Sequence, residues 1–347
     1  MQRRVLGIAV GLSAVLAMAL PGQAAAQRRT ELAVHDQPAC SSKHRMGLDN
    51  ARNFERWLGR RPDRVLDFAW FETWDNIVRS SSLLPGCWKG AGYDRLTFSV
   101  PMLPNDKVST LEQGAAGAYD DKFRQIGAAL VAKGYPDAII RLGWEFNIAA
   151  FPWAAAKNPQ AFVAYWRRIV GVMRSVPGAR FRFDWNPTLD AAWAYPGRIA
   201  PALVYPGDDY VDIIGMDVYN ESWKPANTVQ PQRWRDMVER PYGLRWQRDF
   251  AAQHGKPISF PEWGTGTRPD GHGAGDDPFF IEQMARWIAA NDVVYQGYWD
   301  EEATTFDAKL SNGRQPASAD AYRRAFGGRG RGDASEGRRS HRRRGRH

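Results

Sequence analysis

The chain has 347 residues, 44% of them hydrophobic, which is enough for one large domain or two small ones. Its net charge of +9 comes mostly from the ends: Arg3 and Arg4 near the start, and an arginine-rich stretch at 327–347. The sequence between them is nearly neutral, which argues against nucleic-acid binding by the folded part.

Residues 1–26 have the pattern of a secretory signal peptide. Arg3 and Arg4 are followed by the apolar stretch 5–20 and by three alanines at 24–26, which form a small-residue cleavage site. The apolar stretch is short and ends at Pro21, which favours a cleaved signal over a membrane anchor. We therefore expect a secreted or periplasmic protein with no membrane span after cleavage.

Residues 27–43 are polar and without periodicity, which predicts an N-terminal arm. The only two cysteines are Cys40 and Cys87. In an exported protein an even pair favours a disulfide, although two buried free thiols are the alternative. Neither cysteine lies in a motif typical of a catalytic nucleophile.

Strand-like and helix-like runs alternate over residues 44–326, which predicts one α/β domain. The predicted strands are 45–48, 64–68, 95–100, 138–142, 181–185, 211–218, 257–260 and 294–299. The clearest helices are 53–58, 120–133, 160–175, 234–254 and 279–290. Eight strands in a domain of this size favour a single (β/α)8 TIM barrel, with a doubly wound sheet as the alternative.

The tail, residues 327–347, has no apolar residue larger than alanine, so we expect it to be disordered. Its basic character would suit contact with anionic envelope polymers, and a plain solubilising extension is the alternative.

Two stretches carry a glutamate at the end of a predicted strand. The first is AIIRLGWEFN at 138–147, with Glu145 where the strand stops, and the second is PISFPEWG at 257–264, with Glu262. Barrel enzymes place their reactive groups at these strand ends. A pair of carboxyl groups there suits glycoside hydrolysis, in which one protonates the leaving oxygen and the other acts as nucleophile.

The chemistry predicts Glu145 as the acid/base and Glu262 as the nucleophile, about 5–5.5 Å apart for retention of configuration. Arg141 lies on the same side of its strand as Glu145, because side chains alternate along a strand. Its charge would favour an ionised Glu262, or else it makes a structural ion pair inside the barrel.

The motifs RLGWEFN, DIIGMDVYN, ISFPEWG and GYWDEE at successive strands resemble clan A retaining glycoside hydrolases. They are most similar to family 26, the β-mannanase and endo-β-glycanase group, over about residues 44–326. The resemblance implies acid/base Glu145, nucleophile Glu262, Tyr219 beside the nucleophile, and Trp299 as the aromatic floor where cleavage occurs. Family 26 mannanases usually have His before the acid/base, and this chain has Trp144, so β-mannan and β-glucan both stay open as substrates.

Further substrate-binding candidates are asparagines and tryptophans near strand ends. Asn147 and Asn186 would bind sugar hydroxyls or cap turns. Tryptophans pack on the C–H faces of sugar rings or in the core. Those at loop positions are Trp70, Trp74, Trp144, Trp153, Trp193, Trp223, Trp263 and Trp299, of which we take 144, 153, 263 and 299 as binding candidates.

No cofactor or metal is expected, because the six histidines show no ligand spacing and no Walker or esterase motif is present. We expect a polysaccharide substrate and no nucleic-acid partner. The alternative function is a non-catalytic carbohydrate-binding barrel that keeps both glutamates as sugar-binding groups.

Overall fold

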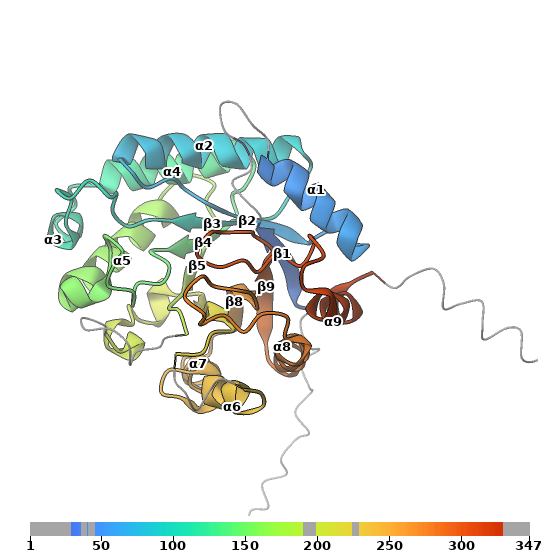
Figure 1. Ribbon diagram of the computed structural model, residues 1–347. Helices are drawn as coiled ribbons and strands as arrows, with labels where there is room; N and C mark the ends of the chain where they lie inside the picture. Colours follow the sequence, from blue (N-terminus) through green and yellow to red (C-terminus); the bar gives the residue numbers. More distant parts are fainter. Residues whose placement is uncertain (1–28, 36–39, 41–45, 190–198, 224–228, 329–347) are drawn as a thin grey trace, which may run out of the picture.

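The computed structural model describes residues 29–35, 40, 46–189, 199–223 and 229–328 (Figure 1). The predicted signal peptide and residues 329–347 of the predicted tail lie outside these ranges, as does Trp193. The expected cleavage and the expected disorder of the tail therefore stay predictions.

The strands are all parallel and close into a barrel. They are β1 (Glu31–His35), β2 (Arg64–Phe68), β3 (Leu96–Val100), β4 (Ile139–Leu142), β5 (Arg182–Trp185), β6 (Ile213–Gly215), β7 (Val218–Tyr219), β8 (Ile258–Gly264) and β9 (Val293–Trp299). β6 and β7 both pair with β8 and form two halves of one barrel strand. β1 pairs with β2 and β9, which completes the ring of eight. The (β/α)8 prediction is confirmed and the doubly wound alternative is excluded.

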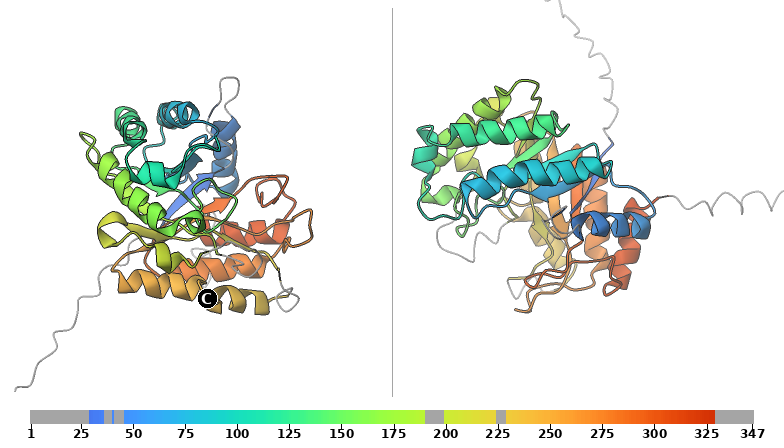
Figure 2. Two further views of the ribbon diagram at one scale, coloured as in Figure 1. Left: turned by 90° about the vertical axis from the view of Figure 1, so that its left-hand side faces the viewer. Right: turned by 90° about the horizontal axis from the view of Figure 1, so that it is seen from above.

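Helices surround the barrel (Figures 1 and 2). They are α1 (Met46–Leu58), α2 (Trp74–Gly90), α3 (Leu111–Ala115), α4 (Asp120–Ala132), α5 (Pro159–Arg174), α6 (Gln232–Glu239), α7 (Leu244–Gln253), α8 (Pro278–Ala290) and α9 (Pro316–Phe326). Short 3-10 turns occupy Ala155–Lys157, Pro201–Val204 and Asp208–Tyr210.

Alternation of side chains along the strands produces two apolar layers. One face of each strand joins the large core between barrel and helices, as Ile140 and Phe183 do. The other face fills the barrel interior with Ala33, Leu66, Ile139, Ile213 and Tyr295. Two residues further along β4, the inward position is Arg141, so the interior becomes polar toward the carboxyl ends of the strands.

The predicted first strand, 45–48, is wrong, and the barrel begins before residue 44. Its first strand is β1, inside the stretch 27–43 expected to be a plain arm, where Leu32, Ala33 and Val34 are buried. Residues 46–48 begin α1, because Leu48, Ala51 and Phe54 share one helical face with Leu58.

The predicted helix 234–254 is two helices, α6 and α7. Pro241 lacks a backbone N–H, Tyr242 adopts a left-handed φ of 58°, and Gly243 follows. Proline disrupts a helix interior, so the break is local and encoded in the sequence. Also, α2, α3 and α9 were not individually predicted.

The predicted disulfide is present. Cys40 and Cys87 are bonded across a separation of 47 residues, which ties the segment after β1 to the last turn of α2. Among the described residues, no helix is both long and apolar enough to cross a bilayer. The same residues contain no group of three or more His, Cys, Asp or Glu arranged to hold a metal ion.

Replacing both cysteines by serine should destabilise the protein. Closing a loop of this length restricts the unfolded chain and contributes up to about 4 kcal/mol to stability. Urea denaturation of the oxidised protein and the Cys40→Ser/Cys87→Ser variant measures the difference. Equal unfolding midpoints would contradict a stabilising role, and the variant's insensitivity to a reducing agent serves as the control.

Candidate active site

A pocket of about 330 Å³ opens where several barrel strands end. Its walls come mainly from the loops after β4, β5, β7, β8 and β9, which is where barrel enzymes bind ligands. The residues that line it are Glu145, Ile148, Thr188, Leu189, Tyr219, Glu221, Trp223, Met237, Arg240, Glu262, Arg268, Trp299, Ala303, Thr305 and Phe306. The cavity therefore brings together the two predicted carboxyl groups, Glu145 and Glu262, with Tyr219 and Trp299.

Glu145 lies in a strained turn just after β4. Its φ is 49° and that of Gly143 is 50°, so both occupy the left-handed region. A Cβ at position 143 would come within 2.7 Å of the Met102 sulfur, which restricts this position to glycine. The backbone N–H of Glu145 donates to the Asn186 carbonyl at 2.7 Å and helps to hold the turn. Such conformations are costly for non-glycine residues and cluster at functional sites.

Glu262 is directed into the barrel by an irregularity in β8. The register between β8 and β9 shifts between Phe260 and Trp263, which is typical of a β-bulge. β9 accommodates the bulge with a glycine, since a Cβ at Gly297 would lie 2.4 Å from the Pro261 carbonyl oxygen. Glu262 consequently faces the pocket, whereas the next residue, Trp263, faces the helices.

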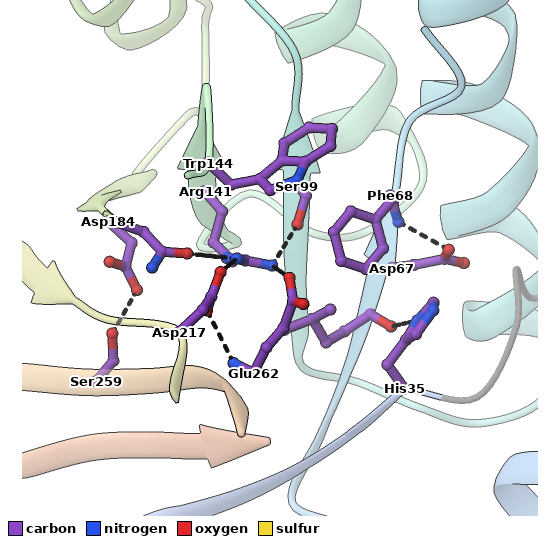
Figure 3. Close-up of polar contacts among 12 residues, drawn as sticks. His35, Asp67, Phe68, Ser99, Arg141, Trp144, Asp184, Asp217, Ser259 and Glu262 are labelled. Atoms are coloured by element: carbon purple, nitrogen blue, oxygen red, sulfur yellow. Dashed lines mark hydrogen bonds and ion pairs between the residues drawn. The ribbon is translucent and has the colours of Figure 1, made fainter. Parts of the chain in front are cut away.

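Three groups fix the Glu262 side chain and backbone, and Figure 3 shows two of them, Arg141 and Asp217. Arg141 Nη1 donates to Oε1 at 2.8 Å, and the Tyr219 hydroxyl donates to Oε2 at 2.7 Å. The backbone N–H of Glu262 donates to Asp217 Oδ1 at 3.1 Å. Both carboxylate oxygens thus accept a hydrogen bond, an arrangement that suits the ionised form.

Arg141 is fully buried and joins side chains from four regions of the barrel (Figure 3). Besides Glu262, it donates to Asp217 Oδ2 at 2.7 Å, to Asn186 Oδ1 through Nε at 2.7 Å, and to Ser99 Oγ at 3.1 Å. Burial alone would lower the pKa of the guanidinium, but Asp217 and Glu262 outweigh this effect and raise it. Arg141 is therefore a permanent cation beneath the pocket.

Glu145 has a different electrostatic environment. Part of its side chain stays accessible, while the surrounding pocket walls desolvate the carboxyl group. This desolvation, with the charge of Glu262, raises the pKa of Glu145 to about 8, despite the opposing charge of Arg141. Glu145 therefore carries a proton at neutral pH.

Trp299 forms an aromatic side of the pocket and is supported by neighbouring rings. His35 stacks on it with ring centroids 4.7 Å apart, and Phe68 meets it edge-on at 5.9 Å. His35 is held in turn by the Leu66 carbonyl at 3.0 Å from Nδ1. Tyr219 approaches the same indole ring edge-on at 6.4 Å.

Several predicted substrate-binding residues do not line the pocket. Asn186 is buried against Arg141, and Asn147 exchanges two hydrogen bonds with the backbone of Thr188. Trp144 and Trp153 are buried in an aromatic cluster with Phe71.

Arg141, predicted to bind substrate, does not line the pocket either; it lies beneath it and donates a hydrogen bond to Glu262. Trp263 is fully buried between barrel and helices, and its indole N–H donates to Gln296 at 2.6 Å. Strand alternation places it on the opposite face from Glu262.

Other pocket residues escaped the sequence-based prediction. Thr188 and Glu221 each lie three residues after the end of a predicted strand, as Glu145 does, so the strand-end rule that selected Glu145 would have found them. Asp217, which lies within DIIGMDVYN, accepts hydrogen bonds from Arg141 and from the Glu262 backbone beneath the pocket, and the motif alone predicts no role for it. Arg268 and Phe306 come from long loops with no periodic pattern, and no sequence signal indicates them.

Comparison with known proteins gives a consistent result. The profile of Glycosyl hydrolase family 26 matches residues 122–238. Endoglucanase H of Acetivibrio thermocellus is 24% identical over 301 residues, which cover 80% of this chain and 29% of that protein. The chain thus spans less than a third of this curated relative.

Solved structures share the fold at low sequence identity. GH26C from Muricauda sp. has a TM-score of 0.60 and 16% identity, and the match covers 85% of each chain. A GH26 β-mannanase from Bacteroides ovatus has a TM-score of 0.54 and 14% identity, covering 85% of this chain and 87% of the other. The family resemblance expected from the sequence motifs is confirmed.

Arg141→Met should destabilise the fold strongly, because it leaves buried Asp217 and the Glu262 carboxylate without their counter-charge. Removing one partner of a buried ion pair costs about 3–5 kcal/mol. The matched control is Arg168→Met, which breaks a solvent-exposed, two-bond pair with Asp120 and should therefore change stability far less than Arg141→Met. Denaturant unfolding of both variants checks this, and equal losses would contradict the central role of Arg141.

Proposed function

We propose that this chain, which matches the profile of glycoside hydrolase family 26 over residues 122–238, hydrolyses β-linked polysaccharides with retention of configuration. Glu145 acts as the general acid/base and Glu262 as the nucleophile. The observation that carries this assignment is the contrast between the two carboxyl groups in one pocket. Glu145 has a pKa raised to about 8, whereas Glu262 accepts hydrogen bonds from Arg141 and Tyr219. A carboxyl group with a raised pKa beside one that accepts hydrogen bonds from an arginine and a tyrosine supplies an acid and a nucleophile.

In the first step a Glu262 oxygen attacks the anomeric carbon, and the glycosidic bond breaks. Glu145 transfers its proton to the departing oxygen, and a covalent glycosyl ester remains on Glu262. In the second step Glu145, now a carboxylate, removes a proton from water while the water oxygen attacks the same carbon. The ester bond breaks, Glu262 regains its carboxylate, and Glu145 is protonated again.

The chain's own residues contribute to both steps. Tyr219, whose pKa is raised by burial and by the Glu262 charge, stays protonated and orients the nucleophile through its hydroxyl. Trp299 offers an aromatic face to the sugar ring, supported from behind by His35. The strained backbone of Glu145 presents its carboxyl group to the same pocket.

The substrate class follows from the similarity to mannanases and to an endoglucanase. We propose β-mannan or β-glucan as the polysaccharide. Trp144 belongs to the aromatic cluster behind the pocket, so neither sugar is favoured by a contact from this residue. With the signal-peptide pattern at residues 1–26, we also propose secretion or export to the periplasm, with the basic tail contacting anionic envelope polymers.

Glu262→Gln tests the proposal directly. The amide keeps the size of the side chain but is a poor nucleophile, so turnover should fall by several orders of magnitude while binding of oligosaccharides persists. Reducing-sugar release from mannan, β-1,3- and β-1,4-glucans and xylan measures turnover, and calorimetry measures binding. A wild-type protein that binds these glycans without cleaving any would instead indicate a carbohydrate-binding barrel.

The pH dependence tests the assignment of Glu145. A general acid must be protonated, and the pKa of Glu145 is raised to about 8, so it is protonated below that pH. We therefore expect kcat/KM to decline as pH rises through about 8, by about tenfold per unit beyond it. Activity maintained to pH 10 would contradict the assignment. The residual activity of Glu145→Gln should lack this alkaline decline.

A further inference from the structure

One wall of the pocket consists of polar side chains that neither step of the reaction uses. Glu221, two residues after Tyr219, lines the pocket beside Trp223 and Arg268. We call these three residues the Glu221 wall. Arg268 comes from the loop after β8, so the wall joins two loops at the carboxyl ends of neighbouring strands.

The Glu221 carboxylate is held by both oxygens. Arg268 Nη1 donates to Oε1 at 2.8 Å, and the Trp223 indole N–H donates to Oε2 at 2.8 Å. A carboxylate has about four acceptor positions, and among the described residues Arg268 and Trp223 occupy two of those on Glu221, which leaves room for a ligand to donate to the others. The side chains of Glu221 and Arg268 keep 20% and 22% exposure, which leaves them reachable from the pocket.

The wall is pre-organised by contacts behind it. His272 stacks on the Trp223 ring at 3.9 Å, and its Nδ1 lies 2.7 Å from the Ser222 carbonyl. Asp270 engages Nε and Nη2 of Arg268, at 3.0 and 2.7 Å, and leaves the other donor to Glu221. A polar group already fixed in place loses little freedom when it binds a ligand.

The charge of the wall favours an uncharged ligand. Arg268 carries one positive charge, while its two carboxylate partners, Glu221 and Asp270, carry two negative charges. The second pocket arginine, Arg240, is likewise paired with Asp236. A uronic acid would therefore meet excess negative charge, whereas sugar hydroxyls would find fixed acceptors and donors.

We propose that the Glu221 wall is a second sugar subsite, which binds the hydroxyl groups of an uncharged pyranose unit adjoining the one that is cleaved. This inference rests on the proposed hydrolase function, because the subsite shares its pocket with Glu145 and Glu262. The wall lies close enough to the acid/base that the Glu221 charge adds to the effects that raise the pKa of Glu145. The ligand class is a neutral β-linked oligosaccharide, and acidic saccharides are selected against.

Two variants test the wall. One changes the acceptor groups of Glu221, and the other removes a hydrogen bond that holds Glu221 in place. Glu221→Gln replaces the charged acceptor by an amide, and Trp223→Phe removes the indole N–H while keeping a ring. Their matched controls lie outside the pocket. Asp120→Asn alters an arginine-paired carboxylate between α4 and α5, and Trp74→Phe removes an indole N–H bonded to Ser109.

Hydrolysis of a series of neutral oligosaccharides of increasing length, taken from the polysaccharide that the wild type cleaves, supplies the readout. Both wall variants should raise KM about tenfold for the longer substrates, since a hydrogen bond to a charged group is lost or weakened. The effect should grow with substrate length and reside in KM rather than kcat, and thermal melting should confirm folding. Glu221→Gln should also lower the ratio of kcat/KM for neutral oligosaccharides to kcat/KM for uronate-containing ones.

Unchanged KM in both folded wall variants would overturn the subsite, as would an equal fall in kcat at every substrate length. The subsite would also be overturned if the control variants raised KM as much as the wall variants do. If the wild type cleaves no glycan, the hydrolase proposal fails first and the subsite with it. If the wild type cleaves a glycan and both wall variants have the same KM values as the wild type, the subsite is refuted and the hydrolase proposal stands.

Discussion

The buried guanidinium of Arg141 joins residues that are far apart in the sequence. Its partners Ser99, Asn186, Asp217 and Glu262 belong to β3 or to segments at the ends of β5, β6 and β8. A cation buried without counter-charge is very unfavourable, so the carboxylates must sit where they do once Arg141 faces inward. The same contacts that satisfy the cation also position Glu262. Stability and function of the barrel are therefore coupled at one side chain.

The polar layer around Arg141 also explains why two glutamates in one pocket differ. Glu262 touches the cation and the Tyr219 hydroxyl, whereas Glu145 sits in a turn above, desolvated and facing another carboxylate. Position relative to a single fixed charge thus separates the proposed proton donor from the proposed nucleophile. The difference arises from the neighbours of the two side chains and not from their own chemistry.

Local sequence patterns predicted most of the fold and the centre of the site. Short apolar runs that end in a glutamate located Glu145 and Glu262, because parallel strands deliver their last residues to one end of the barrel. The first strand was misplaced because β1 is a brief apolar run between charged residues, while residues 46–48 are apolar with helical spacing. Asn147 and Trp263 were chosen by residue type, although their side chains are used in the packing of the scaffold. The Glu221 wall depends on loops that meet only after folding, so no periodic signal marks Arg268.

Gly297 has no side chain, yet it shapes the site. Because β9 carries no Cβ at this position, the Pro261 carbonyl can approach closely and β8 can take in an extra residue just before Glu262. The orientation of Glu262 is thus set partly by the missing side chain at position 297 on the neighbouring strand. Even a single methyl group there would lie 2.4 Å from the Pro261 carbonyl oxygen, so the two strands would have to move apart next to Glu262.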